Sequence, residues 1–482
     1  MADCRTGQLL DLSDGSDRSD RSDRSDRSDR SDWQTGKLAN WRTGQLANWP
    51  SGELTNMKIN PKRIRLALRS PGHFLWAARQ VARAGALGSF ERYCLGGRAL
   101  KPNLLSINIT ARCNLRCAMC MQPRNNTSEG DSPTMRRGGA ELTPEQWLRV
   151  VDQAASARPA FYFTGGEPLL YKGLDRILRH IKSKGLIAAV VTNATTLAQH
   201  AASLVEAGVD NVTVSLDGPE QVHDRIRGAA GTFRRATEGI RALQEARRRA
   251  AKAFPAIKVN CVITRYSIPT LLDTYQIVRE LGVEELNLQH PIFDTAGNIE
   301  LHNRVFPQAM EQQEALGGRL EAGDYEKRLR IGDCGLRIEE TENGREKVGR
   351  ASRLPIKELG EYYDEQLTGE EYAQLEKALV ELLRREKALP RIELFPPVRR
   401  KDCRGYYLDL TYPFRRRCTA PWTTMRLLAD GTLEPCLHYV IGNVAETPLW
   451  KLWNCPRMRN FRVRLVRNGL FPACVRCCYR CY

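Results

Sequence analysis

The stretch from residue 104 to residue 289 alternates short β-like runs with helical segments, and no other feature constrains the fold as strongly. A strand followed by a helix, repeated six times, requires a parallel sheet with right-handed crossovers. Six units are fewer than the eight that close a (β/α)8 barrel. We therefore predict an α/β fold, a partial (β/α)6 TIM-like barrel, whose ligands bind at the carboxyl ends of the strands. The expected strands are 104–110, 161–164, 188–192, 211–216, 257–263 and 285–289.

The helices between these strands are predicted from apolar residues at helical spacing. The first has a clear start signal, because Thr143 is followed by Pro144 and Gln146, which indicates a capping box with proline at the first helical position. The other expected helices are 174–184, 197–207, 233–252 and 268–281.

Changes in composition divide the 482 residues into five parts. Residues 1–56 repeat Ser-Asp-Arg and a Trp-containing eight-residue unit, and such low-complexity sequence predicts disorder. We expect an N-terminal helical segment at 57–101 and the barrel at 102–292. Residues 293–415 are charged and helix-rich, which indicates a linker or a substrate-facing insertion. Residues 416–482 carry a second cysteine group, and we predict a small cluster-binding domain built from a β-hairpin and helices.

Composition limits where the protein works and what it binds. No run of 18 apolar residues occurs and no apolar signal segment opens the chain, so we expect a cytoplasmic protein without a membrane span. The formal net charge of +18 is scattered over Arg-rich helical segments that also contain Glu. This favours a solvated arginine surface, with a nucleic-acid groove as the less favoured alternative.

Cys113, Cys117 and Cys120 form a C-x3-C-x2-C motif directly after the first strand. A [4Fe–4S] cluster normally takes four thiolates, so three ligands on one loop leave one iron open. An open iron can chelate an amine and a carboxylate, the pair that S-adenosylmethionine (AdoMet) presents on its methionine end. The alternative is a zinc ion bound by the triad and a distant fourth ligand.

Three further motifs end later strands. Thr164 to Pro168 reads Thr-Gly-Gly-Glu-Pro, and a glycine pair permits close backbone approach. Asn193 ends the third strand, where a helix-capping asparagine is the simpler interpretation. Asp217, in a Ser-Leu-Asp-Gly-Pro run after the fourth strand, is either a general base, a substrate anchor or a turn-forming residue.

This ordered series resembles the radical SAM superfamily over about residues 102–292. The resemblance implies that the triad binds the AdoMet-cleaving cluster, and it implies contacts to AdoMet at the other motifs. The family usually has an aromatic residue at the position of Met119, so the adenine contact is weaker here. The implied AdoMet-binding residues are Met119, Gly165, Gly166, Glu167, which would meet the methionine ammonium, Asn193, Ser215 and Arg227, which would pair with the carboxylate. Asp217 is the candidate catalytic residue.

The C-terminal cysteines follow the pattern C-x12-G-x4-C and then C-x2-C. Asp430-Gly431 predicts the turn of a β-hairpin between them. The pattern is similar to the SPASM or twitch extension of radical SAM enzymes, which holds auxiliary clusters. We expect one auxiliary [4Fe–4S] cluster; tetrahedral zinc is the alternative. The predicted ligands are Cys418, Cys436, Cys474 and Cys477, with Cys478 or Cys481 able to replace one of them.

The predicted function is reductive cleavage of AdoMet to a 5′-deoxyadenosyl radical, which abstracts hydrogen from a substrate with help from the auxiliary cluster. The resemblance implies a flavodoxin- or ferredoxin-like electron donor. It also implies a peptide, protein or small-molecule substrate, of which a peptide or protein is the first choice. The alternatives are an RNA-modifying enzyme of the same chemistry and a non-catalytic, zinc-stabilised binding protein.

Overall fold

The structure is a computed structural model, and all of its described residues belong to one compact unit that begins at Thr43. It describes residues 76, 83, 86–120, 140–291, 301–302, 304–306, 366–385, 390–398, 400–409, 418–436, 439–471, 474 and 476–477. The predicted disordered tail, 1–56, and the two cysteines Cys478 and Cys481 lie outside the described residues.

Six parallel strands follow one another in sheet order as the alternation predicts, so the α/β fold with six β/α units is confirmed. Every predicted strand is present, with ends shifted by at most one residue. The strands are β1 (Leu104–Thr110), β2 (Ala160–Gly165), β3 (Ile187–Thr192), β4 (Asn211–Ser215), β5 (Ala256–Val262) and β6 (Glu285–Gln289).

The sheet continues beyond the predicted barrel at both ends. Strand β7 (Arg391–Phe395), from the segment expected to be a linker or insertion, pairs in parallel with β6. At the other end β8 (Thr424–Leu427) pairs in parallel with β1. It turns at Gly431, with a φ of 83°, into antiparallel β9 (Thr432–Glu434), which confirms the hairpin. β10 (Gly442–Asn443) closes that edge, so the sheet crosses both predicted boundaries, 292 and 416.

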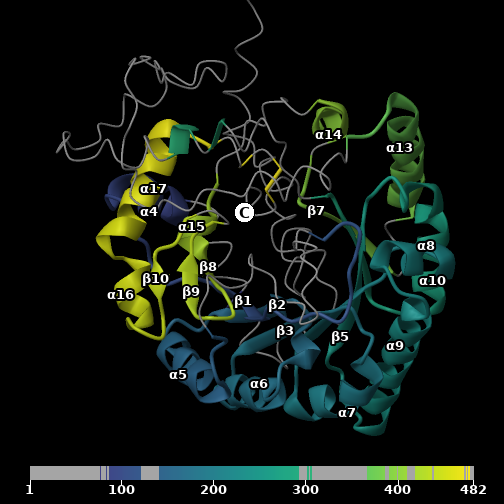
Figure 1. Cartoon of the computed structure of the whole chain (residues 1–482), viewed down its shortest axis with the longest axis horizontal. Helices are drawn as coiled ribbons and strands as arrows, with labels where there is room; N and C mark the ends of the chain where they lie inside the picture. Colours follow the sequence, from purple (N-terminus) through teal and green to yellow (C-terminus); the bar gives the residue numbers. More distant parts are fainter. Residues whose placement is uncertain are drawn as a thin grey trace, which may run out of the picture. The chain divides into compact units, whose positions relative to one another are not determined.

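Helices cover the outer side of the barrel strands (Figure 1). The predicted capping box is confirmed, since Thr143 Oγ1 accepts from Gln146 N–H and the Gln146 side chain accepts from Thr143 N–H. The barrel helices are α5 (Pro144–Ala155), α6 (Leu174–Ser183), α7 (Leu197–Ala207), α8 (Glu220–Arg227), α9 (Thr232–Arg249) and α10 (Leu271–Glu280). The later helices are α13 (Gly369–Arg384), α14 (Arg400–Leu408), α15 (Ala420–Thr423), α16 (Leu449–Trp453) and α17 (Pro456–Asn468). None of the described helices is long and apolar enough to cross a membrane.

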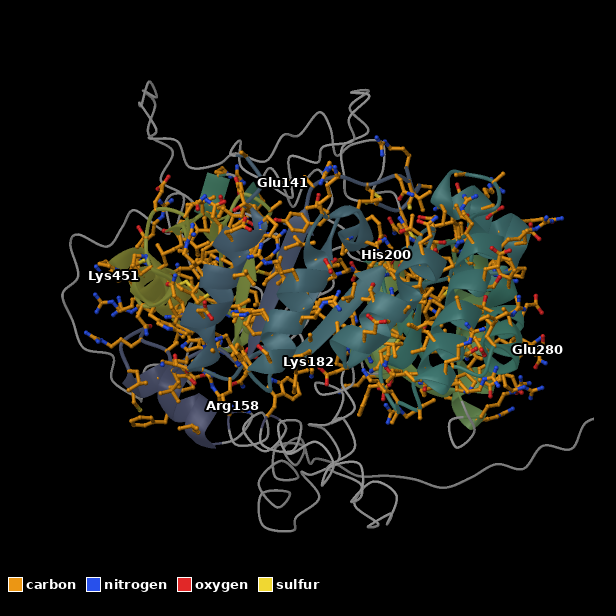
Figure 2. All side chains as sticks on the ribbon, turned by 90° about the horizontal axis from the view of Figure 1, so that it is seen from below. Glu141, Arg158, Lys182, His200, Glu280 and Lys451 are labelled. Atoms are coloured by element: carbon orange, nitrogen blue, oxygen red, sulfur yellow. The ribbon has the colours of Figure 1, made fainter. Side chains whose placement is uncertain are left out.

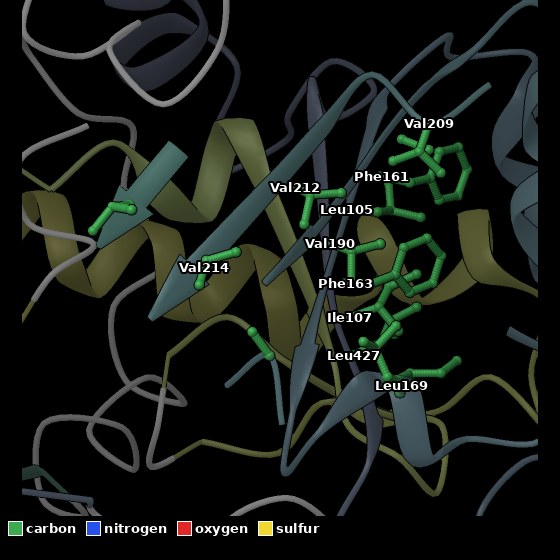
Figure 3. Packing of buried hydrophobic residues seen from close by; sticks show 14 of the residues in the cluster. Leu105, Ile107, Phe161, Phe163, Leu169, Val190, Val209, Val212, Val214 and Leu427 are labelled. Carbon is green, nitrogen blue, oxygen red and sulfur yellow. The ribbon is translucent and has the colours of Figure 1, made fainter. Parts of the chain in front are cut away.

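Successive side chains of a strand point to opposite faces of the sheet, so these strands have one apolar face and one polar face. Leu105, Ile107, Phe161, Phe163 and Val190 are fully buried in one hydrophobic cluster (Figure 3). The alternate positions carry polar groups that pair across strands. Lys258 on β5, Glu285 on β6 and Arg391 on β7 form a row of ion pairs, at 2.7 and 2.5 Å. The polar row explains how β7 is matched in register to β6.

The described part of the N-terminal segment is tied to the C-terminal part of the chain. Helix α4 (Ala86–Cys94) carries Glu91, which forms a buried ion pair with Arg83. Arg83 also donates to the carbonyl oxygen of Trp422 at 2.6 Å, and Arg92 donates to that of Cys418 at 2.7 Å. The described part of the predicted N-terminal helical segment therefore contacts the backbone at and just after the first cysteine of the second group.

Buried neutral histidines make the stability of this fold sensitive to acid. Burial lowers the pKa of His290 to about 3, whereas the unfolded chain protonates near 6.5. The unfolded state therefore takes up the proton first, and His290 stabilises the fold fully only above pH 6.5. Between pH 6.5 and 5 we expect the loss of about 2 kcal/mol of unfolding free energy from this residue. Urea unfolding at both pH values should show it, and a His290→Gln variant should have a flatter pH dependence; equal slopes would contradict the assignment.

Candidate active site

The cluster loop, residues 113–120, leaves the carboxyl end of β1 and carries all three triad cysteines. Each thiol is half-buried, and a turn is closed by the Cys120 N–H, which donates to the Cys117 carbonyl at 3.1 Å. Two N–H groups point at the first sulfur: Leu115 N–H at 3.5 Å and Asn193 Nδ2 at 3.9 Å. Burial raises the pKa of the Cys113 thiol to about 11.

The Gly-Gly-Glu turn after β2 supports the cluster loop from one side. Gly166 N–H donates to the Thr110 carbonyl and Glu167 N–H to the Arg112 carbonyl, both at 2.8 Å. A Cβ on Gly166 would lie 2.0 Å from the Arg112 carbonyl oxygen, and one on Gly165 would lie 2.5 Å from that of Thr110. Glycine is therefore required at both positions, because the end of β2 lies very close to the backbone that precedes Cys113. The sequence motif alone did not reveal this reason.

The Glu167 carboxylate lies inside this support, with 1% of the residue exposed. It accepts from Thr192 Oγ1 at 2.7 Å, Asn193 N–H at 2.7 Å and Leu169 N–H at 3.1 Å. Burial raises the pKa of Glu167, against the opposing effect of these donors. Three of about four acceptor positions of a carboxylate are occupied, which leaves one for the predicted methionine ammonium.

Asn193 joins the end of β3 to the cluster loop. Its Nδ2 donates to Asn114 Oδ1 at 2.9 Å, and its Oδ1 accepts from Thr195 N–H at 2.9 Å. The local Thr195 contact has the form of a turn-capping asparagine, while the Asn114 contact crosses to the loop. The local contact agrees with the capping interpretation, and the contact to AdoMet that the resemblance implies stays a prediction.

Helix α8 supports the cluster loop from the other side. Ala118 N–H donates to the Ile226 carbonyl at 2.8 Å, and Gly228, with a φ of 73°, leaves no room for a Cβ beside the Arg116 carbonyl. Arg227, the last residue of α8, forms an ion pair with Asp217 at 2.6 Å and donates to the Cys117 sulfur at 3.8 Å. Asp217 is fully buried, and its role as a general base or a substrate anchor stays a prediction.

Two predicted residues and one that sequence reasoning missed complete the site. Ser215, the last residue of β4, and Met119, in the cluster loop, are half-buried. Glu141 was missed; it accepts from Thr110 Oγ1 and Ala111 N–H, each at 2.7 Å, at the carboxyl end of β1. Figure 2 shows Glu141 on that side of the strands, opposite Arg158 and Lys182.

His223 was noticed only as part of a motif run. Its Nδ1 accepts from Asp217 N–H at 3.1 Å, and burial lowers its pKa to about 4, so the ring is neutral at pH 7. The pairing of Asp217 with a histidine six residues later is a signal that the sequence did contain.

The second cysteine group comes together from three places in the chain: the start of α15, the end of the hairpin and the segment after α17. Burial raises the pKa of the Cys474 thiol, and the neighbouring thiols of Cys477, Cys418 and Cys436 raise it further. The four predicted ligands that the structure describes are thus neighbours. Arg476 fixes their loop, because it donates to the carbonyls of Tyr406 and Asp409 at 2.9 and 2.7 Å.

Within the described residues, no three His, Cys, Asp or Glu side chains are arranged so that they could hold a metal ion as they stand. Both cysteine sets nevertheless fit iron–sulfur ligation by their chemistry. The triad provides three thiols from one loop, with N–H donors aimed at the sulfurs of Cys113 and Cys117, and the second set brings four thiols near one another.

A family model of the radical SAM superfamily matches residues 107–264. A model of the SPASM iron–sulfur cluster-binding domain matches residues 418–482. The chain therefore contains a radical SAM domain and a SPASM domain. The radical SAM domain implies a [4Fe–4S] cluster and AdoMet, and the SPASM domain implies auxiliary iron–sulfur clusters.

Curated relatives of the radical SAM domain differ in what they make. The AdoMet-dependent heme synthase of Methanosarcina barkeri is 32% identical over 184 residues, which cover 38% of this chain and 48% of that protein. The PqqA peptide cyclase of Rhodopseudomonas palustris is 30% identical over 190 residues, 39% of this chain and 46% of the cyclase. The matches therefore span about half the length of these relatives.

Among solved structures, the chain is similar to Streptococcus suis SuiB bound to precursor peptide SuiA, with a TM-score of 0.48 and 13% identity. The alignment covers 81% of this chain and 72% of SuiB. It is also similar to anSMEcpe with bound AdoMet and a peptide, with a TM-score of 0.44 and 16% identity over 74% of this chain and 81% of that one.

Proposed function

We propose that this chain is an enzyme that reductively cleaves AdoMet and modifies a peptide or protein by hydrogen abstraction. One observation carries the proposal: a C-x3-C-x2-C loop lies at the carboxyl end of β1, held by the Gly-Gly-Glu turn and by α8, with N–H donors directed at two of its sulfurs. When bound, the cluster and AdoMet supply one-electron cleavage of the sulfonium C–S bond to a 5′-deoxyadenosyl radical.

The residues of the chain position these groups. Cys113, Cys117 and Cys120 would hold the cluster, and the fourth acceptor position of the Glu167 carboxylate would receive the methionine ammonium. Ser215 ends β4 at the same carboxyl edge of the sheet as Asn193, which follows β3, and this supports the proposal that both would contact AdoMet. Cys418, Cys436, Cys474 and Cys477 would hold the auxiliary cluster. A flavodoxin- or ferredoxin-like donor and a cytoplasmic location are part of the proposal.

The peptide substrate is supported by the PqqA peptide cyclases among the relatives. A small molecule is the second candidate, because the heme synthase matches a similar share of the chain. RNA is not favoured as a substrate, because several of the arginines that contribute to the positive net charge form ion pairs with glutamates. Arg247 forms an ion pair with Glu284, and Arg248 and Arg249 do so with Glu245. A weak dependence of substrate affinity on salt would support this exclusion.

The test needs no substrate. Full-length protein, reconstituted without oxygen, should hold about eight irons and release 5′-deoxyadenosine from AdoMet with dithionite. The variant with Cys113→Ala, Cys117→Ala and Cys120→Ala should hold about four irons and release none. A Cys94→Ala variant, which removes an exposed thiol, is the matched control and should behave as the wild type. Zinc without iron in the wild type after reconstitution would refute the enzyme and leave the zinc-stabilised binding protein.

A further inference from the structure

Arg227 is a buried cation at the junction of α8 and the cluster loop. Only 7% of the residue is exposed. Its Nη2 lies 2.6 Å from Asp217 Oδ2, and its Nη1 donates to the Cys117 sulfur at 3.8 Å. The buried Glu167 carboxylate is also close enough to interact with its charge. A guanidinium is costly to bury unless anions compensate it, so the surrounding groups determine where this charge sits.

Asp217 is fixed independently of the arginine. Its Oδ1 accepts from Val262 N–H at 2.9 Å, and its own N–H donates to His223 Nδ1 at 3.1 Å. These contacts tie Asp217 to the end of β5 and to α8, so its carboxylate can orient Arg227 toward the cluster loop. The cluster loop is held against α8 by a hydrogen bond from Ala118 N–H to the Ile226 carbonyl.

We propose that the Asp217–Arg227 pair sets the reduction potential of the cluster held by the triad, with Arg227 acting on the Cys117 thiolate and Asp217 positioning Arg227. The inference rests on the proposed function. One-electron reduction adds negative charge to the cluster, and a fixed cation with an N–H directed at a ligand sulfur stabilises the reduced state more than the oxidised one. Arg227 therefore raises the potential, and Asp217 partly offsets that effect.

This role differs from the carboxylate contact that the family resemblance implies for Arg227. Nη2 already faces the Asp217 carboxylate and Nη1 the Cys117 sulfur, so of the three Arg227 nitrogens only Nε lacks a hydrogen-bond partner within the described residues. A residue that tunes the cluster acts in the absence of AdoMet. A residue that binds the AdoMet carboxylate changes AdoMet affinity and leaves the AdoMet-free potential alone.

The experiment is a redox titration of the full chain, reconstituted without oxygen and without AdoMet, followed by EPR of the signal that the triad variant lacks. In Arg227→Gln the equilibrium constant for reduction should fall about tenfold, which is about 59 mV for one electron. In Asp217→Asn it should rise, because the arginine charge then lacks its nearest anion. The matched control is Arg225→Gln, which removes an exposed arginine of the same helix that stacks on Tyr266 at 4.6 Å, and should leave the potential unchanged.

Opposite shifts in the two variants are a signature that loss of structure alone does not produce. The inference is overturned if both variants lower the potential, or if neither changes it while the iron content stays at the wild-type level. A change in AdoMet affinity at constant AdoMet-free potential also overturns it. If Arg227→Gln does not retain its iron, Asp217→Asn decides, since it keeps Arg227 and should still raise the equilibrium constant for reduction. A wild type without iron would instead refute the proposed function.

Discussion

A Gly166→Ala substitution is expected to displace the cluster loop and remove most of the iron bound by the triad. The new Cβ would lie 2.0 Å from the Arg112 carbonyl oxygen, 2.5 Å from its carbon and 2.9 Å from the Ala111 oxygen. All three atoms belong to backbone, so no side chain can turn away to make room. The loop must then move from β2, and the Glu167 N–H bond to Arg112 must break or lengthen.

We expect the unfolding free energy of Gly166→Ala to fall by about 3 kcal/mol, the upper end of the usual cost of overpacking. Iron per chain should approach the value of the triple cysteine variant. The control is Gly369→Ala at the start of α13, where an added Cβ meets no atom within 4 Å, and its stability should change by less than about 0.5 kcal/mol. Wild-type iron content and stability in Gly166→Ala would show that the contact between β2 and the loop is not rigid.

The elements that the sequence predicted well are those specified by local pattern. The six barrel strands combine buried β-branched residues with turn residues at both ends, and the Thr143 capping box is a local hydrogen-bond pattern. Helix α8 was not predicted, because Glu220–Arg227 is largely polar and read as a motif run after the fourth strand. Its importance comes from tertiary contacts, the ion pair to Asp217 and the bond from Ala118.

The pairing of strands that lie far apart in the chain could not be predicted from the sequence. Strand β8 joins β1 across more than 300 residues, and β7 joins β6 after about 100 residues of charged sequence. The residues of β7 or β8 do not identify the partner strand. The free energy of pairing depends on which strands lie at the edges of the barrel sheet, and that is a property of the whole fold. The role of Asp217 has the same origin: its burial depends on Val262 and Arg227, which no local pattern connects to it.

Removal of the Arg462 side chain is expected to destabilise the junction between α17, α15 and the segment after α4. Arg462 is fully buried, and burial lowers its pKa to about 9, against the opposing charge of Glu91. Its Nε donates to the Pro421 carbonyl at 2.7 Å, and its Nη1 donates to the Gly97 carbonyl at 3.1 Å. The guanidinium also stacks over Trp453 at 4.3 Å.

Arg462→Ala leaves two buried carbonyl oxygens without their donor, leaves a cavity beside Trp453 and removes a compensating charge from Glu91. Together these changes should lower the unfolding free energy by about 3–5 kcal/mol, a large part of the total for a typical domain. Arg249→Ala is the control, because that side chain is 79% exposed and only pairs with Glu245 on the surface of α9, an interaction worth about 0.5 kcal/mol or less.

A third variant, Arg462→Met, separates packing from hydrogen bonding. Methionine fills the space beside Trp453 but donates to neither carbonyl, so a loss close to that of alanine would assign the stability to the hydrogen bonds. Urea unfolding followed by tryptophan fluorescence gives the comparison. Because Pro421 lies three residues after the predicted ligand Cys418, the variant should also weaken iron retention at the auxiliary site and leave the triad loaded. Equal stability of Arg462→Ala and Arg249→Ala would contradict the role assigned to this arginine.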